Sequence, residues 1–466
     1  MTSFSSLNTA VLGLNAAQRG MDVTGQNVVN ANTPGYSRQR VSLSASGTST
    51  SATFFTGSSA FFGGVTVDAV TRIRDAFLEG SRVAANARMS ALTTQTSALA
   101  SAEQLVAEPG ETGLQQVLDD FFNAWQDLGN DPTDSGAGAA VIERGQAVAD
   151  QLRFLADGVD ARWTTGHDDL VNVVAQVNQA ATDLAEVNEA VRRGAASGRP
   201  VNELLDQRDQ LVDTLAKLIG ATASAGDDGQ VSVSVNGITL VSGTQAQQFT
   251  LSGATASGTA TTDPPTITWG TITISVDSGE AAGLLAALRT DLPDMADQLD
   301  GVAVAMRDAV NAVHTAGFTL GGAAGGDFFS GSGASDLTVL VTDPDELAVA
   351  DASGVVNGTN AQAIGDLSDD SRALAVLGSS GPSQLWRELT TDVGVRLQSL
   401  QRASTVQQAV VQTAQLAQQA DSGVNLDEEM TSMLLWQRAY QASARVITTV
   451  DEMLDTLINR TGTVGR

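Results

Sequence analysis

The residues that could carry out chemistry are few in this chain of 466 residues. Its two histidines, His167 and His314, each stand alone without a second ligand at metal-binding spacing, so we expect surface or half-buried helical side chains. Cysteine is absent, which excludes disulfides and thiolate metal ligands. A P-loop is also excluded, because the single lysine, Lys217, precedes Leu218 and the glycine run 321–326 has no Lys-Ser or Lys-Thr after it.

Carboxylates are the abundant chemical group, but the sequence does not organise them into a site. An enzyme inserted within residues 221–279 is the alternative, and that segment offers Asp227, Asp228, Asp263 and Asp277 without a histidine. Calcium-loop spacing and a Gly-x-Ser-x-Gly elbow are both missing from the sequence. Solvated surface acids are therefore the favoured interpretation, and we predict no catalytic residue, no cofactor and no metal site.

The balance of charge limits the partners. The chain carries 53 acidic residues against 25 basic ones, a formal net charge of −28. Such a chain repels phosphate backbones and anionic membrane surfaces. The sequence also lacks an uninterrupted apolar run of the ~20 residues that span a bilayer. We therefore expect neither nucleic-acid binding nor membrane insertion.

Two stretches at the ends of the chain carry apolar residues at alternating steps of three and four, the period of a coiled-coil seam. In the first stretch these residues are Phe4, Leu7, Val11, Leu14, Met21 and Val28, with Gln18 and Gly25 filling the two gaps. In the second they are Leu426, Met430, Met433, Tyr440, Ala444, Ile447, Leu454 and Ile458, with Gln437 and Asp451 as polar interruptions. Each stripe occupies one side of a helix whose other side is polar, so neither can be buried alone. We expect the two helices to pack together, the alternative being two unrelated surface helices.

The first stretch is followed by a motif that predicts an abrupt helix end, a turn and an extended exit. The motif consists of Asn30, Asn32, Thr33, Pro34, Gly35 and Tyr36. Its proline cannot continue a helix and forces the preceding threonine into an extended conformation. The glycine after it suits a positive φ, and the asparagines can bond the last free carbonyls of the helix.

This motif closely resembles the N-terminal signature of bacterial flagellar axial proteins. Residues 425–430 and 436–445 resemble the C-terminal signature of the same family. Residues 119–125 and 202–212 resemble the hook–filament junction members in particular. The resemblance covers both ends and most of the helical middle of the chain.

The resemblance implies a structural subunit that joins hook to filament by helical self-assembly of its paired terminal helices. It also implies uncleaved type III export, so we expect a secreted protein located at the hook–filament junction. The implied partners are copies of the chain itself, the hook protein, the second hook–filament junction protein and an export chaperone at the C-terminal region. Another axial subunit, of hook or filament type, and a secreted coiled-coil adhesin are the alternatives.

The rest of the pattern predicts a mainly α fold with a β insert. Helical composition is expected over residues 73–106, 114–128, 139–193, 201–219, 280–315, 360–377 and 382–419, with a possible break at Gly166 and a kink at Pro293. Strand spacing appears at 231–241 and 266–276, and Val41 and Leu43 predict one short strand.

The order of these elements predicts a chain that folds back on itself in three domains. Residues 1–45 and 425–466 would form a terminal coiled-coil domain. Residues 46–220 and 280–424 would form a long helical bundle, with a small α+β segment at 318–358. Residues 221–279 would form a small projecting β domain, furthest from the termini.

Overall fold

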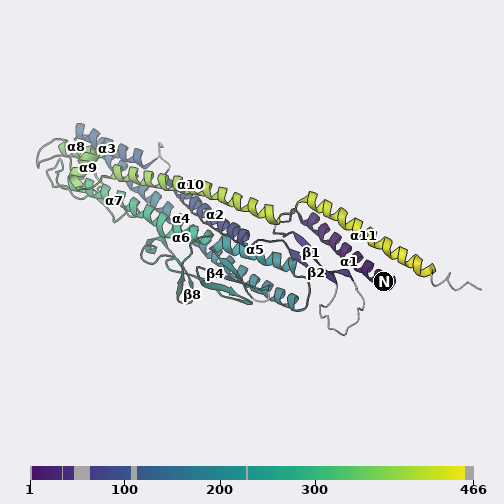
Figure 1. Cartoon of the computed structure of the whole chain (residues 1–466). Coiled ribbons are helices and arrows are strands. Elements are labelled where there is room, and N and C mark those ends of the chain that lie inside the picture. Colours follow the sequence, from purple (N-terminus) through teal and green to yellow (C-terminus); the bar gives the residue numbers. More distant parts are fainter. Residues whose placement is uncertain (1–2, 34, 47–62, 107–112, 227–228, 457–466) are drawn as a thin grey trace, which may run out of the picture.

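The computed structural model describes residues 3–33, 35–46, 63–106, 113–226 and 229–456. The molecule is elongated (Figure 1). Helices α1 (Ser3–Asn30) and α11 (Leu426–Asp455) lie together at one end, so the two ends of the chain meet there. Long helices form the middle, and short helices close the opposite end. The fold is mainly α with small β sheets, and it confirms the predicted packing of the terminal helices.

The terminal helices are antiparallel and share their end of the molecule with a hairpin. Strand β1 (Gln39–Ser46) pairs antiparallel with β2 (Gly64–Arg72), and both contact α1. Only the first of these strands is among those predicted from the sequence. Helix α11 begins at a cap in which the Asn425 side chain accepts a hydrogen bond from the Asp427 N–H at 3.0 Å.

Long helices build the bundle and lie roughly along one direction (Figure 1). They are α2 (Ala76–Glu103), α4 (Ser135–Ala196), α5 (Asn202–Ile219), α7 (Leu292–His314) and α10 (Pro382–Ser422). Helix α4 runs unbroken for 62 residues, about 90 Å at ~1.5 Å per residue. The break considered at Gly166 does not occur, because an interior glycine costs only about 1 kcal/mol and α4 is packed along both halves.

The helical run after the β insert is interrupted just before the expected kink. Helix α6 (Glu280–Ala286) leads into a five-residue π-helix (Ala287–Asp291), which continues directly into α7. Pro293 is the second residue of α7, directly after the π-helix. The Trp163 indole of α4 donates a 3.0 Å hydrogen bond to the Leu288 carbonyl and so fixes the π-helix to the bundle.

The β insert packs on the side of the bundle, which corrects the expectation that it lies furthest from the termini (Figure 1). One antiparallel sheet contains β3 (Thr222–Ala225), β4 (Val231–Val235), β5 (Ile238–Ser242) and β6 (Gln245–Ala246). The other contains β7 (Thr250–Ser252), β8 (Thr266–Trp269) and β9 (Ile272–Ile274). The predicted Asn-Gly turn joins β4 to β5, with positive φ at both residues.

Two asparagines of α4 explain why the insert lies beside that helix. The Asn188 amide donates to the Val231 carbonyl at 2.8 Å and accepts from the Val231 N–H at 3.1 Å. Asn178 makes the same pair of bonds with the backbone of Phe249, both at 2.8 Å. The apolar face of the insert, including Val233, shares one core with the helices. The insert therefore uses the bundle to bury its apolar face.

The end opposite the termini is built from α3 (Leu114–Asn130), α8 (Thr359–Gly365) and α9 (Asp370–Leu377). Short elements complete it, namely β10 (Phe329–Ser330), β11 (Thr338–Val339) and single turns of 3-10 helix at Pro344–Glu346 and Asp366–Ser368. Two further 3-10 turns lie elsewhere, at Gln104–Val106 after α2 and at Ser257–Thr259 in the insert.

His314 lies fully buried at this end of the molecule, whereas the sequence predicted a surface or half-buried side chain. Its Nδ1 lies 2.6 Å from the Gly326 carbonyl, and its Nε2 accepts a 3.0 Å hydrogen bond from the Ala348 N–H. These partners require a neutral ring with the proton on Nδ1. Burial is the main cause that lowers the pKa of His314. The histidine thus joins three segments of the chain.

Acid is expected to loosen this end of the molecule. A lowered folded-state pKa means that the unfolded chain binds the proton first, so stability is retained above pH ~6.5 and falls as the pH drops below it. The free energy of unfolding should fall by up to about 1.4 kcal/mol for each pH unit below this range. Hydrogen exchange of residues 324–350, followed between pH 7 and 5, measures it. The His314→Gln variant should be less stable at pH 7, but its stability should not depend on pH in this way. The control variant His167→Gln should show the same pH dependence as the parent. Equal slopes in all three proteins would contradict this assignment.

Candidate assembly site

Helices α1 and α11 pack in a heptad register of small residues against large ones. A Cβ atom on Gly13 would lie 2.9 Å from the Ser443 Oγ, and a Cβ on Gly20 would meet the indole ring of Trp436. Seven residues further along α1, and seven back along α11, the Asn27 amide donates to Glu429 Oε2 at 2.9 Å. Steps of seven on both helices, in opposite directions, define an antiparallel seam.

The contact on α1 is offset by one position from the stripe predicted from the sequence. The buried residues of α1 are Ala10, Ala16, Ala17, Gly20, Val23, Thr24 and Asn27. Of the predicted residues, Leu7, Leu14, Met21 and Val28 are half-buried at the margins of the contact. Val11 is 39% exposed. The side chain of Phe4 lies outside the described part of the structure. Helix α1 is covered by α11 and by the hairpin, and small residues let both approach closely.

On α11 the predicted stripe divides into two sets. Four predicted residues face α1 as half-buried side chains, namely Met433, Tyr440, Ile447 and Leu454. The seam positions between them are Glu429, Trp436, Ser443 and Val450. Each lies one residue before a position of the predicted stripe. Ala444 of the stripe is also half-buried, and Ile458 lies outside the described residues. Leu426 and Met430 were expected in the seam but are about half exposed, at 49% and 52%. The prediction chose Met430 because it is apolar, whereas the structure buries its polar neighbour Glu429 in the seam.

The turn after α1 is organised by Asn27, which the predicted motif did not include. Asn27 is buried; its amide nitrogen donates to the Gln39 carbonyl at 2.9 Å, and its oxygen accepts from the Gln39 N–H at 2.9 Å. The same oxygen accepts the Tyr36 phenol at 2.8 Å. A single side chain thereby fixes the start of β1 against the end of α1. Asn27 and Thr24 are the two polar residues among the buried residues of α1, and no feature of the predicted stripe pointed to either.

The motif residues take the roles expected of a helix end and turn. The Asn30 amide donates to the Gln26 carbonyl at 3.0 Å, and the Tyr36 N–H donates to the Thr33 carbonyl at 3.2 Å. Gly35 has a positive φ, and a Cβ there would lie 2.8 Å from the side-chain Cδ of Gln210 in α5. Asn32 is exposed, and Pro34 lies outside the described residues.

Charge completes the contact between the turn and α11. The Arg38 guanidinium donates to Glu429 Oε1 at 2.8 Å and to Glu428 Oε2 at 2.9 Å. Burial, followed by the charges of Asp206, Glu429 and Glu203, raises the pKa of Tyr36 to about 12. The phenol therefore remains a hydrogen-bond donor over the whole physiological range. The buried carboxylate of Glu429 is satisfied by an amide and a guanidinium, as a buried charge requires.

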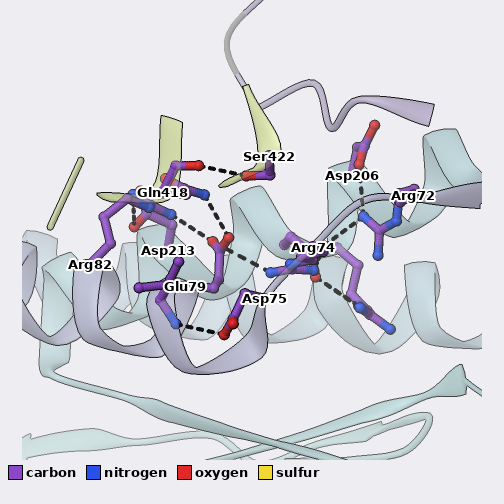
Figure 2. Close-up of polar contacts among 12 residues, drawn as sticks. Arg72, Arg74, Asp75, Glu79, Arg82, Asp206, Asp213, Gln418 and Ser422 are labelled. Carbon is purple, nitrogen blue, oxygen red and sulfur yellow. Dashed lines mark hydrogen bonds and ion pairs between the residues drawn. The ribbon is translucent and has the colours of Figure 1, made fainter. Parts of the chain in front are cut away.

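An ion-pair network joins this terminal unit to the bundle (Figure 2). Arg72, the last residue of β2, donates to Asp206 and Asp209 of α5, both at 2.7 Å. Arg74 also pairs with Asp209, and with Glu79 at 3.4 Å. These groups are largely buried, so salt screens them less than surface pairs.

The network continues onto α2 and α10. Arg82 bridges Glu79 at 2.8 Å and Asp213 at 3.1 Å, and the Gln418 amide donates to Glu79 at 2.8 Å (Figure 2). A cavity of about 780 Å³ lies at this joint, between the turn after α1, helix α5 and the end of α10. Charged and polar groups line the cavity where the chain passes from β2 into α2 and from α10 into α11.

Comparisons with known proteins agree on one family. Residues 99–329 match the model described as the flagellar hook-associated protein FlgK helical domain. Flagellar hook-associated protein 1 of Bacillus subtilis is 30% identical, with both chains covered completely. The chain belongs to the flagellar hook-associated protein 1 family. It is therefore a structural subunit of the bacterial flagellum, of the hook–filament junction type.

Further comparisons cover the ends of the chain and the fold. Flagellar hook-associated protein 1 of Salmonella typhimurium is 28% identical, over 98% of this chain and 99% of its own length. Residues 7–36 match the flagella basal body rod protein model, and residues 417–460 match the C-terminal model of the rod proteins FlgEFG. The flagellar hook junction protein FlgK from Burkholderia pseudomallei has the same fold, with a TM-score of 0.64, 16% identity and coverage of 73% of this chain and 99% of that one.

No group of three or more His, Cys, Asp or Glu side chains in the described part of the chain could hold a metal ion. Likewise, none of the described helices is long and apolar enough to cross a membrane. His167 is half-buried and stacks on Trp163, with ring centroids 5.4 Å apart. Asp263 and Asp277 lie on the insert, and Asp277 accepts a hydrogen bond from Asn236 at 2.7 Å.

Proposed function

We propose that this chain joins hook to filament by helical self-assembly through its terminal helices, after export from the cell. The observation that carries this proposal is a set of large apolar side chains left exposed on α11. They are Leu426, Met430, Leu434, Leu435, Val446 and Met453. An exposed apolar set on a helix marks an interaction surface.

The energetics favour association through these residues. Burying apolar surface contributes about 25 cal/mol per Å². Among the described residues, α1 is the element that packs on α11, so the exposed apolar residues gain this contribution when another subunit packs on them. Of these residues, Leu435, Val446 and Met453 belong to one row of α11, positions 435, 439, 442, 446, 449 and 453, which repeats at steps of four and three away from the α1 seam. We call this row the outer face of α11.

The remaining partners follow from the family. We propose contacts with the hook protein, with the second hook–filament junction protein and with an export chaperone at the C-terminal region. As a proposal we keep the division into a terminal unit (1–45 and 425–466), a bundle (46–220 and 280–424, with an α+β segment at 318–358) and an insert (221–279), except that strand β2 packs with the terminal unit and not with the bundle. Enzymatic activity has no place in this proposal.

Images of a deletion strain test the junction role. Negative-stain electron microscopy should show intact hooks without filaments, and filament protein should be found in the medium. Loss of the hook as well would point to a rod or hook subunit instead. Normal flagella in the deletion strain would contradict any structural role in the flagellum.

Charged substitutions test the use of the terminal helices. We expect Leu14→Asp or Ile447→Asp to leave the bundle folded and to block assembly, because each places a carboxylate at the margin of the α1–α11 contact. Circular dichroism reports the fold, and swimming in soft agar reports assembly. Val171→Asp, at an exposed apolar residue of α4, is the matched control and should swim normally. Normal swimming by both seam variants would refute assembly through these helices.

A further inference from the structure

Charge is distributed unevenly along the exposed helices of this acidic chain. Residues 403–420 of α10 contain no charged residue over eighteen positions, while the chain carries a net charge of −28. At ~1.5 Å per residue this stretch spans about 27 Å. Over a comparable length of α4 the exposed residues include Asp150, Asp157, Asp160, Asp168 and Asp169. The C-terminal half of α10 is therefore an uncharged surface on a strongly negative protein.

One side of this stretch is occupied by α2, and the other is free in the single chain. The inner row includes Gln407, whose amide donates to the Ala85 carbonyl at 2.9 Å, and Gln418, which binds Glu79. The outer side exposes large apolar side chains, with Val406 at 67%, Val410 at 47% and Leu416 at 66%. Alanine, threonine and glutamine fill the positions between them. We call this outer side, over residues 403–420, the neutral face.

We propose that the neutral face of α10 is a lateral contact with a second copy of this chain, an inference that rests on the proposed function. Identical chains of net charge −28 repel one another, and the repulsion is strongest where acidic faces meet. A face without charge is where two copies can approach without desolvating carboxylates. Exposed valine and leucine supply the apolar contact, and glutamine amides both donate and accept hydrogen bonds.

The position of the neutral face supports a second copy as its occupant. Helices α10 and α11 lie along the same long edge of the molecule (Figure 1). The neutral face therefore lies on the same edge of the molecule as α11. One continuous edge would then carry subunit contacts from the terminal unit to the middle of the molecule, and the ion-pair network at the joint would hold its two halves in line.

Substitutions at Val410 test the role of neutrality. Val410→Glu should reduce the swimming zone to that of the deletion strain, whereas Val410→Gln, equally polar but uncharged, should keep most of it. Phe154→Glu, on the acidic face of α4 at 61% exposure, is the matched control and should swim like the parent. Circular dichroism should show all three purified proteins folded. Full swimming by Val410→Glu would overturn the proposal.

Cross-linking identifies the occupant and separates this inference from the proposed function. A photo-reactive phenylalanine analogue at position 410 should give, in intact flagella, a dimer of this chain as judged by mass spectrometry. The same analogue at Leu435, on the outer face of α11, tests assembly through the terminal helices. A dimer from position 435 without one from 410 overturns the neutral face and leaves the proposed function standing. A cross-link from position 410 to a different protein also overturns the neutral-face contact. If neither position gives a dimer, both the neutral-face contact and assembly through the terminal helices are overturned.

Discussion

Replacing Gly20 with alanine is expected to force α1 away from α11 and to abolish assembly. An added Cβ would lie 2.8 Å from Trp436 Cε3 and closer still to two other atoms of the indole ring, so the ring must move as a unit. Overpacking of this kind costs about 1–3 kcal/mol. Hydrogen exchange of α11 amides should accelerate about tenfold for each 1.4 kcal/mol lost. Swimming should fall with it, because the terminal helices present the assembly surface.

Gly25 on the same helix provides the matched control. A Cβ on Gly25 would meet nothing within 4 Å, so Gly25→Ala should stabilise the helix by about 0.5–1 kcal/mol through backbone entropy alone. Combining Gly20→Ala with Trp436→Ala should cost less than the sum of the two single changes, since removing the ring relieves the clash. Equal protection of α11 in the Gly20 and Gly25 variants would show that the close approach is not required.

The sequence predicted which helices pair, but not which of their residues meet. Large apolar residues at three-four spacing pointed to Leu14 and Met21, while the structure uses the smaller residues Ala17 and Gly20 beside them. Hydrophobic periodicity weights large side chains, whereas close helix packing selects small ones. Two partners cover α1, and a pattern read along one helix carries no information about the second partner, the hairpin.

The positions of the β elements depended on tertiary partners in the same way. Strand spacing located β4 and the Asn-Gly turn, because these signals are local. The insert was expected to stand furthest from the termini, but Asn178 and Asn188 of α4 bond its backbone and bring it alongside the bundle. Asparagine in a long helix has no distinctive local pattern. Strand β2 was missed although it carries the same local signal, since Val65 and Val67 alternate with Thr66 and Asp68.

Replacing Asn27 with alanine is expected to release the turn after α1 and the start of α11 together. The change leaves the buried N–H and carbonyl of Gln39 without partners and removes one hydrogen bond from the buried Glu429 carboxylate. Each orphaned group costs about 1–3 kcal/mol, so the local loss should be on the order of 3–5 kcal/mol. Hydrogen exchange of residues 39–46 and 429–440 should accelerate in both segments, and assembly should fail.

Two further variants decide whether the amide of Asn27 is the cause. Asn15→Ala removes an exposed asparagine from the same helix and should leave exchange and swimming unchanged. Asn27→Asp keeps the shape but places a second carboxylate beside Glu429, where the amide donated at 2.9 Å. Like charges at this distance cannot both remain ionised without cost, so this variant should be worse at pH 7.5 than at pH 5.5. If Asn27→Ala exchanges like the parent in both segments, the turn is held by the backbone alone, and the network of Asn27, Tyr36 and Glu429 does not hold the terminal helices in register.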